Sequence, residues 1–161
     1  MLRTIIIAAV FITSIGQGAS AESANRYMLF NECAPISFIL YIDGAHTHEN
    51  LIRSEVEGVV ELKLRAAQIL HDDDSGFAPG SLGFLGMGIH AVSVKDVGHA
   101  YFVTTEMIKY VTDMASGESN IANTWRHNGT ALGGIPELKA EVVDAANTFI
   151  AQYLVVNSPA C

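Results

Sequence analysis

Residues 82–111, LGFLGMGIHAVSVKDVGHAYFVTTEMIKYV, decide the fold of this chain. The first half predicts a strand, Leu82–Val94, because its side chains alternate with the period of two that a β-strand produces. One set is Leu85, Met87, Ile89 and Ala91, and the other is Gly86, Gly88, His90 and Val92. The turn Asp96-Val97-Gly98 separates this strand from a second one, His99–Val111. The stretch therefore predicts an antiparallel hairpin, with glycines that indicate close packing or a bend on one face.

A strand and a helix precede the hairpin. The segment Ile36–Ile42 is rich in strand formers and ends at the turn pair Asp43-Gly44. The following segment predicts a helix from about His48 to Leu70, with Thr47 as its cap. Its apolar residues recur at helical spacing and predict one buried stripe, formed by Ile52, Val56, Val59, Val60, Leu64 and Ala67.

A third strand and a second helix follow the hairpin. The strand runs through Ile121, Asn123 and Trp125, which alternation places on one face. The segment His127–Ile135 contains three glycines and is predicted to be a loop. Pro136 is expected to open the last helix at its first position. The order β-α-β-β-β-α predicts a single α+β domain, with both helices on one face of a mainly antiparallel sheet.

The first residues of the chain have the three parts of a secretory signal, which we assign to residues 1–21. Arg3 supplies the positive charge, Ile5–Ile12 the apolar run, and Ala19-Ser20-Ala21 the cleavage site. The run is too short for a membrane span, which needs about 20 apolar residues. A lipid anchor is not expected, because Glu32 stands before Cys33 where lipid attachment needs a small residue. We therefore expect a periplasmic or secreted protein without a membrane span, with a short segment at 22–32 and the domain at 33–161.

The charge of the chain excludes some classes of partner. Nine Lys and Arg residues stand against 17 Asp and Glu residues, a formal net charge of −8. Such a chain repels phosphate backbones and anionic lipid surfaces, so no nucleic-acid partner is expected.

Cys33 and Cys161 are the only cysteines, and they allow one intramolecular disulfide. The bridge would close a loop of about 130 residues, for which the chain-entropy model gives up to ~5 kcal/mol. No Cys-x-x-Cys spacing is present, so a structural bridge is favoured over a redox-active pair.

Several short motifs resemble those of a family of small exported bacterial proteins of uncharacterised function. They are Val60–Ala67 (VELKLRAA), Ala115–Ser119 (ASGES), Asn123–Trp125 (NTW) and Phe149–Asn157 (FIAQYLVVN), with the terminal Cys161. The resemblance implies export and a shared fold, and it transfers no catalytic residue. The element order alone is also similar to small envelope domains such as the N-terminal domain of TolB, which act as adaptors; a shared fold does not imply a shared function.

Two clusters are weak candidates for a metal site. His46 and His48 would point the same way from an extended backbone and could share a metal ion with Glu49; the alternative is a solvated turn that enters the helix. Asp72 and Asp74 belong to a run of three aspartates that would attract a hard cation such as calcium. The alternative there is a solvated acidic loop, because the spacing of a calcium-binding loop is absent.

Single residues of the strands give further candidates. His90 and His99 lie on the two strands of the hairpin and would form a metal-binding or titrating pair only if the register brings them together. Trp125, the single tryptophan, is interpreted as a core residue, with an aromatic contact for a partner as the alternative.

No catalytic or nucleotide-binding motif is found in the sequence. We therefore favour a non-catalytic domain, without a cofactor, that binds another envelope protein or a small ligand. A metal-binding protein that uses His46 and His48 is the first alternative, and a small envelope hydrolase is the second. The oligomeric state is left open.

The disulfide gives the first testable prediction. Reduction of the protein is expected to lower its melting temperature by several degrees, because a few kcal/mol is a large share of a small domain's stability. Thermal unfolding followed by circular dichroism, with and without reductant, measures the difference. Identical melting curves would contradict a stabilising bridge between Cys33 and Cys161.

Overall fold

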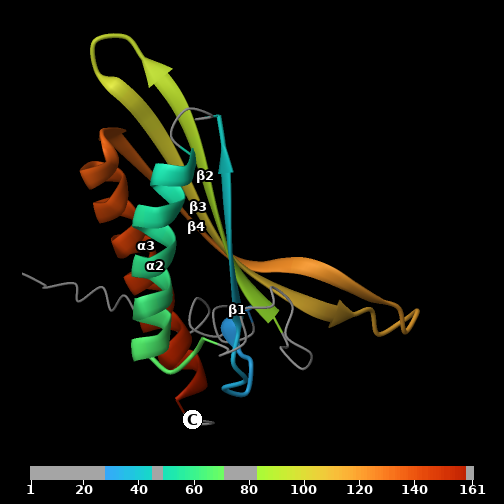
Figure 1. Ribbon diagram of the computed structural model, residues 1–161. Coiled ribbons are helices and arrows are strands. Elements are labelled where there is room, and N and C mark those ends of the chain that lie inside the picture. Colours follow the sequence, from blue (N-terminus) through green and yellow to red (C-terminus); the bar gives the residue numbers. More distant parts are fainter. Residues whose placement is uncertain (1–27, 45–48, 71–82, 159–161) are drawn as a thin grey trace, which may run out of the picture.

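A computed structural model describes residues 28–44, 49–70 and 83–158. Its elements are β1 (Ser37–Asp43), α2 (Glu49–Ala66), β2 (Gly83–Val94), β3 (Gly98–Thr112), β4 (Ser119–Gly133) and α3 (Ile135–Asn157) (Figure 1). The predicted α+β class and the order β-α-β-β-β-α are both confirmed. The predicted signal at residues 1–21 lies outside the described residues.

The four strands form one sheet in the order β1-β2-β3-β4. β2 and β3 make the predicted antiparallel hairpin, in which Gly83 pairs with Lys109 and Val94 with Gly98. β4 adds to β3 in the antiparallel direction, whereas β1 is parallel to β2. A parallel pair needs a long crossover between its strands, and α2 lies within that connection.

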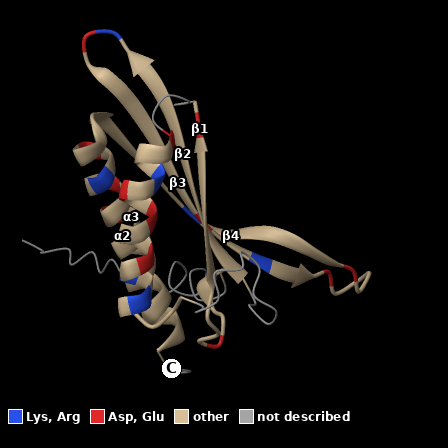
Figure 2. Ribbon diagram, viewed as in Figure 1, with Lys and Arg blue, Asp and Glu red and all other residues tan. Residues whose placement is uncertain are grey.

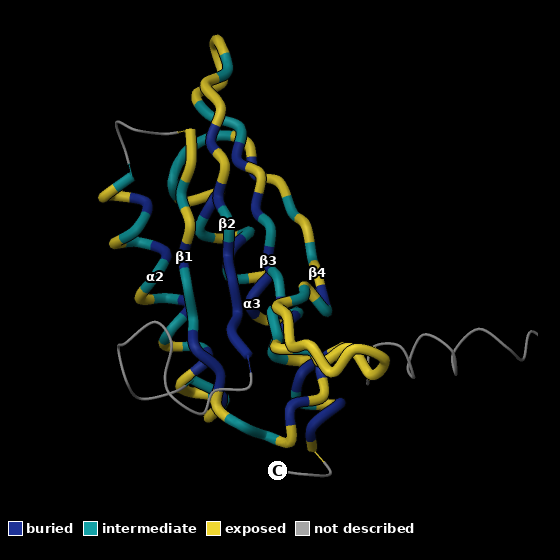
Figure 3. The backbone as a smooth tube through the Cα atoms, turned by 90° about the vertical axis from the view of Figure 1, so that its right-hand side faces the viewer, coloured by how far each residue is buried: buried dark blue, intermediate teal, exposed yellow. Residues whose placement is uncertain are grey.

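Both helices cover the same face of the sheet, as predicted. They lie side by side in two views at right angles, and no described helix lies on the opposite face (Figures 1 and 3). Side chains with almost no exposed surface fill the space between the helices and the sheet; they include Ile52, Val56, Val60, Leu64, Leu85, Met87, Val103, Leu138, Val142 and Phe149. Within the described part of the chain, neither helix combines the length and apolar character that a membrane crossing requires.

A buried polar network fixes the segment before β1 to the end of α3. The Asn157 side chain accepts a hydrogen bond from the backbone N–H of Asn31 at 2.8 Å, and its amide donates to the carbonyl oxygen of Leu29 at 3.0 Å. Tyr153, one helical turn earlier, donates its hydroxyl to the carbonyl oxygen of Ala34 at 3.2 Å. Burial raises the pKa of the Tyr153 phenol. Leu29 and Asn31 are both buried, so the packed unit begins before Cys33.

A tight turn connects this network to β1. The backbone N–H of Ala34 donates to the carbonyl oxygen of Asn31 at 2.8 Å, and the two residues between them, Glu32 and Cys33, have φ angles of 50° and 58°. Residues other than glycine rarely adopt this left-handed backbone conformation. The contacts around the turn must therefore stabilise it. The turn places the Cys33 sulfur 3.5 Å from the carbonyl oxygen of Asn157. Cys161 lies outside the described residues, and its bridge to Cys33 stays a prediction.

The segment His127–Gly133 is strand and not the predicted loop. β4 continues to Gly133, and Gly129 and Gly133 pair with Val103 and His99 of β3. Gly129 lies under α3, where the Glu141 side chain occupies the space that a β-carbon would take. A glycine in a paired strand beneath a helix cannot be distinguished from a loop glycine by the sequence pattern alone.

A β-bulge changes the alternation of β4. Met107 pairs with Trp125, but Ile108 pairs with Asn123, which leaves Thr124 as an extra residue. Trp125 therefore faces the helices, while Ile121 lies on the opposite face and is half exposed. The prediction that these two residues share one face is wrong, because strict alternation does not allow for the bulge.

The first helix is shorter than predicted. α2 ends at Ala66 and does not reach Leu70, because Gln68 adopts a left-handed conformation with a φ of 59°. The chain then turns inward, which buries Ile69 and forms an isolated parallel bridge between Leu70 and Ile36.

The second helix begins one residue earlier than predicted, so Pro136 is its second residue. The Glu137 carboxylate accepts a hydrogen bond from the backbone N–H of Gly134 at 2.8 Å and closes the N-terminus of α3. The same bond lowers the pKa of Glu137.

Substitution of Asn157 tests the polar network. Asn157→Ala leaves the buried N–H of Asn31 and the carbonyl of Leu29 without partners, at a cost of about 2–4 kcal/mol in the free energy of unfolding. Denaturant unfolding measures the loss. Asn147→Ala on the same helix is the matched control, since Asn147 is exposed and its side-chain oxygen accepts a hydrogen bond from the Lys63 ammonium at the surface. Equal effects of the two substitutions would contradict a structural role for the network.

Candidate functional site

The face of the sheet that the described helices leave uncovered, here called the open face, is the candidate site. Register fixes which side chains form it, because residues paired across strands lie on the same face. The central row runs through Tyr41, Gly88, Thr104 and Asn128. The row on one side holds Ile39, Gly86, Glu106 and Arg126, and the row on the other side holds Asp43, His90, Phe102 and Thr130.

Large apolar side chains on the open face are exposed to solvent. Tyr41 is 54% exposed and Phe102 is 50% exposed, although both belong to strands within the sheet. Four further residues of this face share the property: Val92, Tyr110, Ile121 and Leu132. Single exposed apolar residues are common on protein surfaces, but the six are distributed along one face of one sheet and give that face an apolar character, as contact surfaces often have.

The ionisable side chains within this face contact one another across neighbouring strands. Arg126 forms an ion pair with Glu106 on the neighbouring strand, and the Asn123 amide donates to the same Glu106 carboxylate at 3.0 Å. At the end of β1, the Asp43 carboxylate lies 3.2 Å from the Nδ1 atom of His90. The His90 ring in turn lies 6.3 Å from the ring of Phe102, measured between centroids. The centre of the face therefore combines aromatic groups with charges that offset each other.

A shallow hollow crosses the open face between β3 and β4. It has a volume of about 260 Å³ and is lined by Phe102, Thr104, Asn128 and Thr130 among others. Gly88 pairs with Thr104 on the neighbouring strand, and only the Thr104 carbonyl oxygen would come within 4 Å of a β-carbon on Gly88. Over Gly86, in contrast, the side chains of Tyr41 and Ile108 close the space. The face thus has half-exposed aromatic rings beside a shallow hollow.

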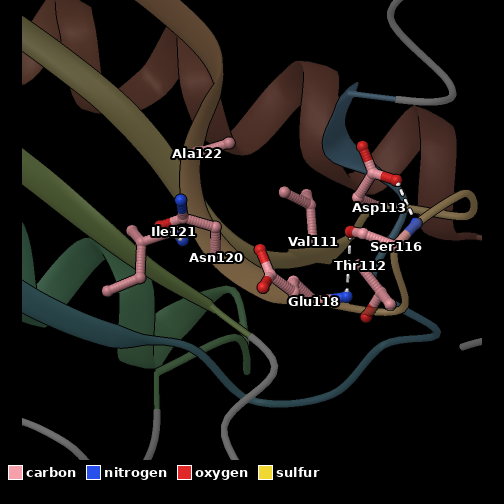
Figure 4. Close-up of a pocket in the computed structure, with 8 residues that line it drawn as sticks. All are labelled: Val111, Thr112, Asp113, Ser116, Glu118, Asn120, Ile121 and Ala122. Carbon is pink, nitrogen blue, oxygen red and sulfur yellow. Dashed lines mark hydrogen bonds between the residues drawn. The ribbon is translucent and has the colours of Figure 1, made fainter.

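A two-stranded arm, residues 110–121, extends the sheet beyond the first residue of β2. Figures 1 and 3 show this hairpin projecting away from the helices. Met114 at its tip is 96% exposed. A second hollow of about 460 Å³ lies along the arm and is lined by Val111, Thr112, Asp113, Ser116, Glu118, Asn120, Ile121 and Ala122 (Figure 4).

The tip of the arm is held by one carboxylate. Asp113 Oδ1 accepts hydrogen bonds from the backbone N–H groups of Ser116 and Ala115 at 2.8 and 2.7 Å, and the two bonds lower the pKa of Asp113. Glu118 donates its N–H to the Ser116 hydroxyl at 3.2 Å. The polar groups of the tip therefore bond one another and stabilise the turn. We assign the tip a structural role.

The metal candidates of the sequence have different outcomes. His46, His48, Asp72 and Asp74 all lie outside the described residues, so their metal site stays a prediction. His90 and His99 do not meet, because His90 pairs with Phe102 while His99 pairs with Ser93. In the described ranges, no group of three or more His, Cys, Asp or Glu side chains is placed to hold a metal ion.

Trp125 lies in the core. It is 7% exposed, its ring meets the ring of Phe149 edge to face at 5.4 Å, and its indole N–H donates to Gln152 at 2.9 Å. The His127 ring stacks on its other side, with centroids 6.2 Å apart. The contacts between the sheet and α3 therefore account for Trp125, in agreement with its interpretation as a core residue.

Sequence reasoning did not single out Tyr41, Phe102, Glu106 and Arg126. The signal was present in the strand alternation, which groups Phe102 and Glu106 apart from the buried Val103 and Met107. Alternation separates the two faces of a strand, but it does not say which face the helices cover.

Comparisons with protein-family models, with curated proteins and with solved structures found no match.

The pKa of Asp113 predicts how the arm responds to acid. Because the folded-state pKa lies below the unfolded value, the turn is stabilised above the unfolded pKa and loses this contribution as the pH falls through the folded pKa. Amide hydrogen exchange at Ala115 and Ser116 should therefore become less protected in strong acid. Asp113→Ala should remove that pH dependence, and Asp96→Ala in the other hairpin turn is the control. Unchanged protection of wild-type Ala115 and Ser116 in acid would contradict the assignment.

Proposed function

We propose that the protein is an exported, non-catalytic binding domain whose open face binds a partner protein. One observation carries the proposal: the uncovered face of the sheet presents half-exposed aromatic and aliphatic side chains around a central pair of opposite charges. The secretory features of the first residues support an envelope or extracellular location for this interaction.

The composition of the open face fits a protein contact. The central parts of protein interfaces are enriched in Tyr, Phe and Arg and depleted in Lys. Tyr41, Phe102 and Arg126 stand in three adjacent rows of the described sheet, and the lysine nearest to them on β3, Lys109, belongs to the opposite face. Lys109 donates to the carbonyl oxygen of Phe30 at 3.0 Å.

The rest of the fold makes this face rigid. β2 and β3 are paired along almost their whole length, and the opposite face of both strands is packed against the helices. A rigid platform limits the conformational entropy that is lost on binding. The raised groups Tyr41 and Phe102 can therefore act as fixed contact points for a partner.

Site-specific photo-crosslinking in the producing cell tests the proposal. A photoreactive amino acid in place of Phe102 should give a covalent protein adduct, because the side chain points from the open face into solvent. The same amino acid in place of Leu62, which is 69% exposed on α2, is the matched control. In the presence of the Tyr41→Glu substitution the adduct at position 102 should disappear, since a carboxylate would be desolvated in the contact.

Thermal unfolding separates a lost contact from a lost fold. Tyr41→Glu should leave the melting temperature within a few degrees of the wild type, because Tyr41 is more than half exposed. Equal adducts at positions 102 and 62, or no adduct at position 102, would contradict binding at the open face.

A further inference from the structure

We infer that the protein bound at the open face is a second copy of this chain, related by a two-fold axis that brings two open faces together. This inference rests on the proposed function of the face and names its partner. Charge, shape and area support it separately.

The open face carries few charged residues, so two copies of this acidic protein can approach each other there with little repulsion. With a net charge of −8, two molecules repel each other wherever their acidic surfaces approach. In the described part of the chain, charged residues gather on the helices and at the hairpin turns, and most of the sheet is free of them (Figure 2). Near the centre of the open face the charges of Glu106 and Arg126 offset each other.

The Glu106–Arg126 pair is also self-complementary. Under a two-fold axis, a contact from residue i to residue j is repeated from residue j to residue i. A neighbouring pair of opposite charges can then face its own copy with Glu106 opposite Arg126 on both sides. Arg126 has the reach for this contact, because its side chain is 55% exposed while the Glu106 carboxylate lies lower in the sheet.

The shape of the open face is self-complementary as well. A face with raised groups alone would need a partner with hollows. Here the half-exposed rings of Tyr41 and Phe102 and the hollow between Thr104 and Asn128 belong to the same face. A two-fold axis placed between a ring and the hollow would set the ring of each copy over the hollow of the other. Two sheets packed face to face interdigitate their side chains in this way, at a spacing of about 10 Å.

The area is sufficient for a stable dimer. At the usual strand spacing and rise per residue, the four-stranded part of the face measures roughly 20 by 30 Å in projection. Contact between two such faces buries more than about 1,000 Å² in total, which is the lower size of a specific protein interface. Tyr110 and Ile121 lie on the arm, which projects from this end of the sheet on the side away from the helices, and they are not counted in that area.

A charge-exchange experiment distinguishes a second copy from any other partner. The wild-type protein should have twice the monomer mass in light scattering after gel filtration. Glu106→Arg and Arg126→Glu should each be monomeric, because each places like charges against like across the two-fold axis. An equimolar mixture of the two variants should form a heterodimer, since one face is then positive at its centre and the other negative. Circular dichroism confirms that each variant is folded.

A second pair of variants serves if a charge reversal prevents folding. Phe102→Glu should be monomeric, whereas Leu62→Glu on the helical side should remain dimeric. A wild-type protein that stays monomeric from micromolar to millimolar concentration would overturn the inference. So would a dimer that survives Phe102→Glu, or two monomeric, folded charge variants whose mixture does not associate.

The outcome of photo-crosslinking separates this inference from the proposed function. A monomeric wild-type protein whose position 102 still crosslinks to a different protein overturns the second copy and leaves binding at the open face intact. A monomeric protein without any adduct at position 102 overturns both.

Discussion

The side-chain amide of Asn157 is the interaction on which the arrangement of the domain depends. It bonds the backbone of Asn31 and of Leu29, two residues that precede every strand, from the last turn of the last helix. The bonds hold Leu29 over the end of the core and fix the turn in which Cys33 approaches α3. Because α3 also covers β3 and β4, one buried amide ties the segment before β1 to the far side of the sheet.

Sequence reasoning predicted the elements whose signals are local. The period-two alternation of β2 and the helical spacing of Ile52, Val56, Val60 and Leu64 were enough for the class, the order and the placement of both helices on a single face of the sheet. The errors have non-local causes. Gly129 lies in a paired strand beneath the Glu141 side chain of α3, and the bulge at Thr124 is defined only by the pairing of β4 with β3. Neither cause can be found in the segment itself.

The candidate site was less predictable than the fold. Attention to histidines and aspartates led to His90, whose neighbour is Asp43 on β1, a strand 47 positions earlier in the sequence. The open face owes its character to residues of ordinary strand type, such as Tyr41 and Phe102, which gain importance only because both helices pack on the other side. Which of two alternating sets is left exposed is decided by the helices, and therefore by tertiary packing.

The hydrogen bond between Asn31 and Asn157 also limits how early during synthesis the domain can complete its folding. The two residues are 126 positions apart, so at synthesis rates of about 5–20 residues per second roughly 6–25 s pass between their additions to the chain. The β2–β3 hairpin can form within that time, but the segment before β1 has no partner for its buried polar groups until the last turn of α3 exists. A nascent chain therefore cannot complete this end of its core until the last helix has been made.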